Sequence, residues 1–460
     1  MMPGESSLSK GYKRTKVGVI PEEWHEGTAS DLFRVVTGTT PSTSSPEYWE
    51  DGTLLWITPT DLSTNNGQIY IFNCERKITD AAVRDYNLHR LPVGSIIVST
   101  RAPVGYVALN RNVAYINQGC KGLIPKETVS GAEVYYSYYL KSRTSELTRM
   151  SGGSTFKELS KQSLESFPMP IPQNNECRRI ATILSTVDAA IAATDEVITK
   201  TEELKRGLMQ DLLSKGVDED GRVRSEETHE FYDIQGMRVP VEWGVTKLEK
   251  AIRIYDCKHY TPHYVENGYP IIRPQNVSGG YLDLASSNFV SDEDYKILTE
   301  KHQPHYGDII YSRNASMGIA VYVDTHEQFC IGQDMVVMTK SSSNPHFVYY
   351  CLQSEIVANQ IKRLSSGSTF HRINLKNIRK MIIPNPSTDE QDSIVRTLST
   401  IDARAKSERI YRTRLLTLKK GLMQDLLTGR KRVPLNGAGG MPGPGSQNVT
   451  ACAPPPEGRP

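Results

Sequence analysis

The sequence predicts an α+β fold: two similar β-rich domains separated by two long antiparallel coiled-coil helices, in a tandem duplication with pseudo-two-fold symmetry. Two observations lead to this prediction. The heptapeptide Gly207–Leu213 recurs unchanged at Gly421–Leu427, 214 residues later, and a repeat of this kind reveals the architecture of a chain. Apolar residues also follow a period of 3.5 in the segment that carries the first copy and begin the same way in the second, which is typical of helices that pair.

Further blocks match at nearly the same shift, so the repeat extends through most of the chain. They are Ile180–Ile191 with Ile394–Ala405, Ser151–Phe156 with Ser365–Phe370, Val93–Gly105 with Tyr306–Gly318, Trp56–Leu62 with Ile271–Val277, and Ile20–Trp24 with Val239–Trp243. The last third of each half is close to a copy, whereas the first two-thirds share only short framework segments. One part of the repeated unit therefore keeps a common structural role, and the other part is free to differ.

The first β-rich domain covers residues 1–172. Short apolar runs bounded by glycine or polar residues predict strands at Ser95–Ser99 and Leu123–Pro125. The aromatic spacing of Val134–Ser142 predicts a short helix. The four tyrosines of that helix favour a place in the core over a stacking platform for bases.

The first long helix is predicted over residues 173–216. Its apolar seam consists of Ile180, Leu184, Val187, Ile191, Thr194 and Ile198. Pro172 precedes the helix and Gly216 ends it, as the usual preferences at helix ends require. About 40 residues at 1.5 Å each correspond to a helix of roughly 60 Å.

The second half repeats this order. Residues 217–386 begin with an acidic, turn-rich linker and then form the second β-rich domain. Its expected elements are strands at Asp308–Ser312 and Met335–Thr339 and a short helix at Phe347–Ser354. The second long helix follows over residues 387–432. Residues 433–460 are rich in glycine and proline and lack periodicity, which predicts a disordered tail.

The order of the segments has a geometric consequence. If the two long helices pair, the second must run back along the first, and one β-rich domain then lies at each end of the pair. Such a molecule holds two binding sites at a fixed distance, and its pseudo-two-fold symmetry suits double-stranded DNA. The alternative is that each helix packs only on its own domain, but a seam of this length favours a partner helix.

Composition defines the broad class of protein and leaves the ligand open. The 460 residues carry 54 Lys and Arg against 52 Asp and Glu, so the net charge neither requires nor excludes nucleic acid. Seven scattered cysteines without a CxxC pair argue against a disulfide framework and structural zinc. No apolar run is long enough to span a membrane, and the polar N-terminus lacks the core of a secretory signal, so a cytoplasmic location is expected.

The order of these motifs resembles that of the specificity (S) subunits of type I restriction–modification systems. The resemblance rests on the starts Ile20–Trp24 and Val239–Trp243, the Gly-Ser-Thr-Phe blocks Gly153–Phe156 and Gly367–Phe370, the proline-rich junctions before the long helices, and the helix ends Lys205–Leu213 and Lys419–Leu427. It covers roughly residues 11–433. As a set in this order the motifs are highly specific, although no single block would be.

The resemblance implies a sequence-specific DNA-binding subunit with two target-recognition domains, each reading one half of a bipartite, asymmetric target. It also implies modification (methyltransferase) and restriction (endonuclease/translocase) subunits as partners that dock with the help of the long helices. S-adenosylmethionine, ATP and Mg would belong to those partners. This chain is expected to be non-catalytic, because it contains neither an NPPY-type methyltransferase motif nor a GxxxxGK[ST] phosphate loop.

Two other functions stay open at this point. One is a duplicated coiled-coil scaffold whose end domains bind proteins, which the basic and amide-rich matched loops disfavour. The other is an autonomous nuclease or methyltransferase, for which the sequence offers no catalytic motif.

Base recognition requires hydrogen-bonding side chains on rigid loops, and phosphate contacts require basic groups or backbone amides. Three groups of residues meet these requirements: the two strand ends, the two Gly-Ser-Thr-Phe blocks with the basic residues after them, and a loop of the second half that differs from its counterpart Thr58–Asp61. The DNA-binding candidates, in chain order, are Thr100, Arg101, Thr155, Lys157, Arg273, Gln275, Asn276, Arg313, Asn314, Thr369, His371 and Arg372.

Each group has a structural alternative. The strand ends can be solvated turns, the blocks can be hinges that cap the long helices, and the third loop can differ because surface loops vary freely. Cys257, His259 and His263 are close in sequence but lack a fourth ligand and a counterpart in the first half, so no metal site is expected. Polar residues off the helix seam are candidates for partner contacts against the default of a solvated face; they include Glu202, Glu203, Lys205, Lys419 and Lys420.

Overall fold

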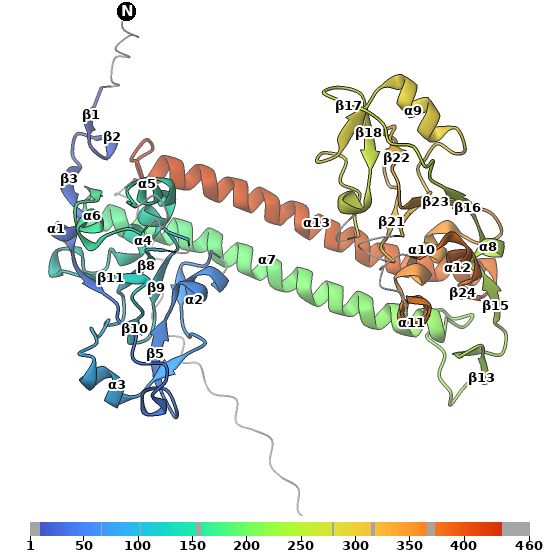
Figure 1. The fold of residues 1–460 in the computed structure, drawn as a ribbon, viewed down its shortest axis with the longest axis horizontal. Helices are drawn as coiled ribbons and strands as arrows, with labels where there is room; N and C mark the ends of the chain where they lie inside the picture. The colour runs from blue at the N-terminus through green and yellow to red at the C-terminus, as the bar shows by residue number, and fades with distance from the viewer. Residues whose placement is uncertain are drawn as a thin grey trace, which may run out of the picture. The chain divides into compact units, whose positions relative to one another are not determined.

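The computed structural model describes residues 10–65, 67–101, 103–152, 158–277, 280–313, 318–365 and 373–434. The chain divides into two compact units (Figure 1). Unit 1 contains the described residues up to Ala193 and from Thr413 onward, and unit 2 contains Thr194–Arg412. Each unit therefore holds one β-rich domain together with a part of each long helix, whereas the predicted segments kept each helix whole.

Unit 1 is built on a five-stranded sheet in the order β4-β11-β8-β9-β6. These strands are β4 (Phe33–Thr37), β6 (Tyr70–Ile71), β8 (Ile96–Ser99), β9 (Val107–Asn110) and β11 (Cys120–Pro125). Alternate residues of β8 point into two different apolar cores: Ile96 and Val98 into one, Ile97 into the other. The sheet is thus covered on both faces, which explains why its central strands are continuous apolar runs.

Smaller elements complete unit 1. The other strands are β1 (Tyr12–Thr15), β2 (Gly18–Pro21), β3 (His25–Thr28), β5 (Leu54–Ile57), β7 (Lys77–Ile78), β10 (Ala114–Ile116) and β12 (Pro168–Ile171). The short helices are α1 (Ala29–Leu32), η1 (Pro46–Tyr48), α2 (Pro59–Thr64), α3 (Asp80–Asp85), η2 (Glu127–Val129), α4 (Glu133–Ser142), α5 (Thr144–Arg149) and α6 (Lys161–Glu165). The tyrosines of α4 are buried in the core, as predicted.

Unit 2 repeats the architecture with two four-stranded sheets, β16-β23-β20-β21 and β17-β19-β18-β22. Its strands are β13 (Phe231–Ile234), β14 (Met237–Pro240), β15 (Gly244–Lys247), β16 (Ile252–Asp256), β17 (Tyr264–Val265), β18 (Tyr269–Ile272), β19 (Asn288–Val290), β20 (Ile309–Ser312), β21 (Ala320–Tyr322), β22 (Cys330–Ile331), β23 (Met335–Lys340) and β24 (Ile382–Asn385). Its short helices are α8 (Leu248–Ala251), η3 (Pro274–Val277), α9 (Asp292–Thr299), α10 (Pro345–Gln353), α11 (Glu355–Ser365) and α12 (Leu375–Lys380). All four predicted strands and both predicted short helices are therefore present as β8, β11, β20, β23, α4 and α10.

The long helices are α7 (Asn174–Ser214) and α13 (Thr388–Leu426), inside the predicted ranges. In unit 2, Asp195 of α7 pairs with Arg412 of α13, and Lys205 further along α7 pairs with Asp402 earlier in α13 (2.7 Å). The two helices are therefore antiparallel there. In unit 1, Asp188 of α7 pairs with Lys419 (2.5 Å) in the same sense. No helix in the described part of the chain is long and apolar enough to cross a membrane.

A tyrosine, an aspartate and a lysine join each β-rich domain to the helices of its unit. In unit 1, Tyr138 of α4 donates a hydrogen bond to Asp188 of α7 (2.6 Å), and the same carboxylate pairs with Lys419 of α13. The equivalent group in unit 2 consists of Tyr350, Asp402 and Lys205. Lys205 and Lys419, which the sequence offered as partner-contact candidates, are largely buried in these groups and are engaged inside the chain.

A second repeated contact, the Trp–Glu–Arg clasp, closes each unit. In unit 1, the carboxylate of Glu176 in the first turn of α7 accepts hydrogen bonds from Trp24 Nε1 (2.9 Å) and from Arg432 Nε and Nη2 (2.7 and 3.0 Å). Glu176 is fully buried, and its hydrogen bonds raise the pKa of Arg432. The clasp of unit 2 consists of Trp243, Glu390 and Arg224. The arginine follows a long helix in both cases, after α13 in unit 1 and after α7 in unit 2.

Candidate nucleic-acid interface

The two predicted strand ends have the same backbone geometry. The loop after β8 is closed by a hydrogen bond from Gly105 N to Ser99 O (2.9 Å), and the loop after β20 by one from Gly318 N to Ser312 O (3.4 Å). Both glycines have positive φ, +99° and +80°, which other residues rarely adopt. A Cβ on Gly105 would also lie 2.6 Å from Thr144 Cγ2 of α5. The described residues thus close both strand ends in the same way, at matched ends of the two central sheets.

Backbone hydrogen bonds connect these loops to the segments that follow the Gly-Ser-Thr-Phe blocks. Leu159 N donates to Thr100 O in unit 1, and Ile373 N donates to Arg313 O in unit 2, both at 2.9 Å. In each unit the strand end is therefore bonded to a described residue that follows the Gly-Ser-Thr-Phe block in the chain. The candidates Thr155, Lys157, Asn314, Thr369, His371 and Arg372 lie outside the residues that the structure describes.

The side chains of Thr100 and Arg313 point inward. Thr100 is fully buried and donates its hydroxyl to Gly119 O (3.1 Å). Arg313 is 6% exposed, and its guanidinium donates to Asp256 Oδ1 (2.5 Å) and Ile373 O (3.3 Å). A buried arginine is stable only when it is paired. These contacts therefore have a structural role: they hold the strand ends in place. Arg101 is half-buried instead, and among the described strand-end candidates it alone offers a side chain to the surface.

The third candidate group, Arg273, Gln275 and Asn276, likewise contains both a buried side chain and more accessible ones. Asn276 is buried, and its side-chain oxygen accepts a hydrogen bond from Arg273 N (3.1 Å). In unit 1, Asp61 accepts one from Thr58 N (2.8 Å). Asn276 and Asp61 therefore share a capping role at the start of η3 and α2.

Arg273 and Gln275 are the members of this group that are not fully buried. The guanidinium of Arg273 donates to Tyr264 Oη (3.2 Å) and to Asn288 Oδ1 (3.1 Å). Its Nε is buried and has no hydrogen-bond acceptor within the described residues. The side chain is thus fixed at one end and retains an unsatisfied donor, while Gln275 is exposed.

Two exposed arginines escaped the sequence reasoning although the repeat could have revealed them. Arg149 in the last turn of α5 and Arg363 near the end of α11 are 214 residues apart and stand shortly before the Gly-Ser-Thr-Phe blocks. Their positive charge and their exposure suit contacts to phosphate.

A third arginine was missed because its partners are distant in sequence. The guanidinium carbon of Arg76 lies 3.8 Å from the ring centroid of Trp49 and 5.3 Å from that of Trp56. The two indoles meet edge to face, 4.9 Å apart. Stacking of this kind orients an exposed arginine at little entropic cost. Arg76 is therefore a candidate for DNA contacts made by unit 1.

The described residues contain one group that could hold a metal ion, and it differs from the group considered in the sequence. His302, His305 and Asp308 bring one ligand atom each within 4.8 Å of one another. However, His302 Nε2 lies 2.7 Å from Asp308 Oδ2, and the amide of His305 donates to the same oxygen. The Asp308 carboxylate is thus already used by these hydrogen bonds, in which it caps the turn before β20. Cys257 is buried, and burial raises the pKa of its thiol.

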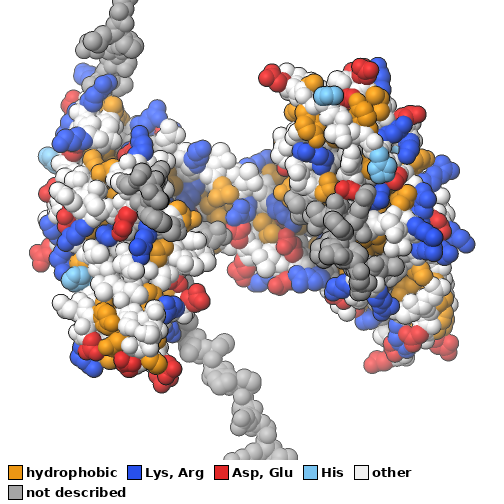
Figure 2. Space-filling model, viewed as in Figure 1, with side chains coloured by type: hydrophobic (Ala, Val, Ile, Leu, Met, Phe, Trp, Pro, Cys, Tyr) orange, Lys and Arg blue, Asp and Glu red, His pale blue; other side chains and the backbone are white. Residues whose placement is uncertain are grey.

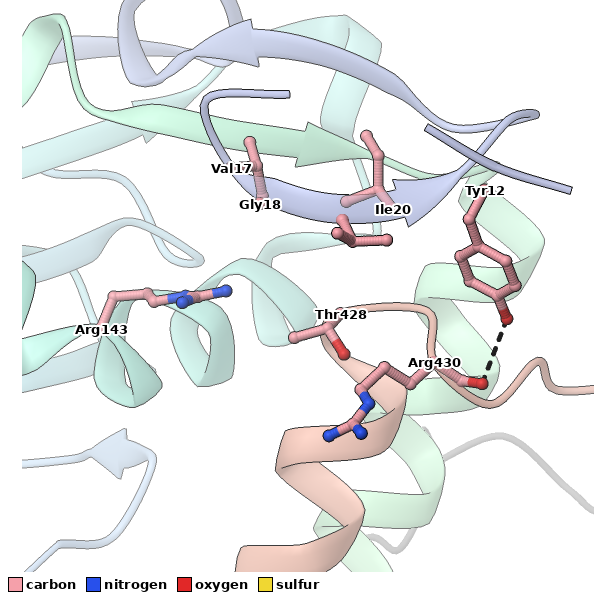
Figure 3. A pocket seen from close by; sticks show the side chains of 8 residues that line it. Tyr12, Val17, Gly18, Ile20, Arg143, Thr428 and Arg430 are labelled. Atoms are coloured by element: carbon pink, nitrogen blue, oxygen red, sulfur yellow. Dashed lines mark hydrogen bonds between the residues drawn. The ribbon is translucent and has the colours of Figure 1, made fainter. Parts of the chain in front are cut away.

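Unit 1 also contains an open cavity of about 440 Å³, shown in Figure 3. Its lining residues are Tyr12, Val17, Gly18, Val19, Ile20, Arg143, Thr428 and Arg430. Tyr12 Oη donates to the Arg430 carbonyl (3.1 Å), so the β1–β2 hairpin is fastened to the segment after α13. None of the DNA-binding candidates lines this cavity, which belongs to the closure of unit 1.

Known proteins match the chain over both repeats. The family described as "Type I restriction modification DNA specificity domain" matches residues 21–205 and 240–413. The type I restriction enzyme MjaIX specificity subunit of Methanocaldococcus jannaschii is 30% identical over 398 residues, which cover 84% of this chain and 89% of that protein. The EcoR124I/EcoR124II specificity subunit of Escherichia coli is 30% identical over 190 residues, 40% of this chain and 45% of that one.

Solved structures agree with the fold. The S subunit of a type I restriction–modification system from M. genitalium superposes with a TM-score of 0.57 at 16% identity, covering 91% of this chain and 97% of that one. At this identity the similarity concerns the fold alone. The family match extends over most of the chain and confirms the resemblance inferred from the motifs: the chain belongs to the family of type I restriction–modification specificity subunits.

Proposed function

We propose that this chain is the non-catalytic, DNA-reading subunit of a type I restriction–modification complex, and that each unit reads one half of a bipartite, asymmetric target. One observation carries the proposal: the units share a backbone frame but differ in the side chains at its matched positions. The strand-end loops are closed by equivalent hydrogen bonds. On that frame, Arg273 of unit 2 stands where unit 1 has Thr58.

A shared frame with different side chains is what recognition of two different half-sites requires. Rigid backbone places a side chain at a fixed distance from the base edges, and the type of side chain then selects the base. In unit 2, Arg273 is the strongest candidate for base contact, because hydrogen bonds to Tyr264 and Asn288 hold its guanidinium in place. Arg101, Arg149 and Arg363 suit contacts to phosphate.

The long helices offer surfaces for the partner subunits. In unit 2, Leu204 of α7 and Ile410 and Tyr411 of α13 are exposed, and in the unit 1 part of α13 so are Leu416 and Leu418. Exposed apolar residues on helices that are otherwise polar favour contact with another protein over a solvated face. We propose methyltransferase subunits as the occupants, with the restriction subunit joining them. In this proposal S-adenosylmethionine, ATP and Mg are bound by those subunits, and the complex acts on DNA in the cytoplasm.

Methylation mapping tests the proposal directly. The chain is expressed with its methyltransferase subunit in a host without other adenine methylation, and the methylated positions are sequenced. We expect a single motif with two different specified halves separated by unspecified bases. The absence of new methylation, or a motif without two parts, would contradict the proposal.

Single substitutions then assign the halves. Arg273→Ala should relax one half of the motif and leave the other unchanged, whereas Arg101→Ala should lower the extent of methylation and leave both halves of the motif unchanged, because a phosphate contact carries no sequence information. Arg238→Ala is a matched control, because Arg238 is exposed in unit 2 and paired with Glu226 and Asp233. If neither test variant alters any DNA activity, the scaffold alternative is favoured. Arg313 is unsuitable for this test, since its loss would leave Asp256 without its partner.

A further inference from the structure

Six basic side chains gather on one surface of unit 2, which we call the basic patch. Figure 2 shows Lys and Arg side chains clustered at the edge of unit 2 where Figure 1 places α8 and α12. The members are Lys247, Lys250, Arg253, Lys376, Arg379 and Lys380, all of them exposed. The first three lie before, within and just after α8, and the other three lie on α12.

Local structure brings the two rows together. Helix α8 packs against α12, and Leu248 N donates to Met381 O (2.8 Å) at the junction. On α12, positions 376, 379 and 380 have the spacing that places side chains on one helix face. The patch is therefore a continuous surface formed by two short helices and the start of β16.

The charge of the basic patch is not neutralised by the residues that the structure describes. Among the residues that the structure describes, none of the six side chains forms an ion pair. Helices α8 and α12 together contain one acidic residue, Glu249. Six like charges at this spacing repel one another and so reduce the stability of the fold. Binding of an anionic ligand would explain why these side chains are all basic.

The matched surface of unit 1 lacks this character. The equivalent positions, at shifts of 219 and 214 residues, are Thr28, Asp31, Arg34, Gln162, Glu165 and Ser166. One is basic and two are acidic, against six basic residues in unit 2. Unit 1 nevertheless has the same helices in contact, α1 with α6. The shared frame therefore does not require the basic residues, and they are a property of unit 2 alone.

We propose that the basic patch binds the sugar–phosphate backbone of double-stranded DNA beside the half-site read by unit 2. This inference rests on the proposed function and adds to it a contact that does not depend on sequence and that only one unit makes. Helix α12 begins two residues after Ile373, whose amide is bonded to the strand end at Arg313. Helix α12 of the patch thus follows directly on a segment that is bonded to the strand end of β20, one of the positions of the candidate interface. Lysine and arginine without aromatic neighbours on either helix suit phosphates better than unstacked bases.

The test compares the assembled methyltransferase complex with a variant that carries the unit 1 residues in a charge-neutral form. The variant is Lys376→Gln, Arg379→Gln and Lys380→Ser, and dissociation constants are measured on a cognate duplex at several salt concentrations. Each phosphate contact contributes about 0.9 to the slope of log affinity against log salt, so three lost contacts should make the slope shallower by about 2.7. The methylated motif should stay the same, because phosphate contacts carry no sequence information.

The chain offers a matched gain-of-charge variant. Gln162→Lys, Glu165→Arg and Ser166→Lys place the α12 residues on α6 of unit 1 and on the residue that follows it. This variant should bind with a steeper salt dependence than the unaltered complex if exposed charge at this surface reaches DNA. Melting midpoints close to that of the original chain would show that both variants fold, as expected for exposed positions.

The outcomes separate the patch from the proposed function. An unchanged salt slope in the neutral variant overturns the proposal for the patch. If the variant complex has also lost a protein subunit, the patch is a protein-docking surface instead. Failure of the proposed function would appear instead as the absence of a bipartite methylated motif in the unaltered complex. A shallower slope with the motif unchanged supports the patch as a DNA backbone contact.

Discussion

Replacing Glu176 by alanine should open the clasp of unit 1. The substitution removes two charge-assisted hydrogen bonds from Arg432 and one hydrogen bond from Trp24 Nε1. An indole N–H left without an acceptor in a fully buried site costs about 1–3 kcal/mol. Arg432 is about one-third exposed and can turn to water, so its lost bonds count for only ~1–2 kcal/mol. We expect a loss of ~3–4 kcal/mol, within the ~3–5 kcal/mol typical of a broken buried pair.

Hydrogen exchange measured by mass spectrometry shows in which unit the stability is lost. In Glu176→Ala, peptides that cover β1, β2 and the segment after α13 should exchange faster, while peptides of unit 2 should not change. The matched control is Glu390→Ala, which breaks the equivalent bonds to Trp243 and Arg224 and should affect unit 2. The reasoning is refuted if Glu176→Ala costs under about 1 kcal/mol by this measure, or if exchange increases equally in both units.

Three further predictions concern DNA and pH. Arg149→Ala and Arg363→Ala should each weaken binding about equally on all sequences and reduce the salt slope by about 1, measured by filter binding at several salt concentrations. Arg273→Ala should cost about 1–3 kcal/mol on the cognate duplex and almost nothing on one altered in that half-site, as competition binding can establish. Burial lowers the pKa of Lys141 to about 8, so the unfolded state binds more protons between about pH 8 and 10.5, and this side chain makes stability rise with pH there. Lys141→Met should remove the rise in melting midpoint, whereas Lys200→Met on the exposed face of α7 should leave it.

The sequence predicted the frame well because the frame follows from local patterns. The period of 3.5 identified α7 and α13 as helices, the residues before them located their starts to within a few residues, and short apolar runs located β8, β11, β20 and β23. The exact repeat at Gly207–Leu213 made the two halves comparable. These signals depend on burial in one segment at a time, which sequence periodicity reports directly.

The candidate site was harder to predict, because exposure depends on contacts between distant residues. Thr100 and Arg313 had the right chemistry, but hydrogen bonds to Gly119 and Asp256 turn them inward. Asn276 likewise serves as a cap. Conversely, Arg76 is oriented by two tryptophans that no local pattern connects to it. Whether any candidate contacts DNA stays a prediction that the substitutions above address.

The composition of unit 1 from two distant stretches of chain has a consequence for synthesis on the ribosome. Unit 2 is continuous from Thr194 to Arg412, so all of it is made before the last part of unit 1. Glu176 must wait for Arg432, and at about 5–20 residues per second the intervening chain takes roughly 12–50 seconds to appear. During that interval the nascent chain holds a carboxylate whose counterion does not yet exist. The second-made unit is therefore the first that can close, and the amino-terminal one matures last.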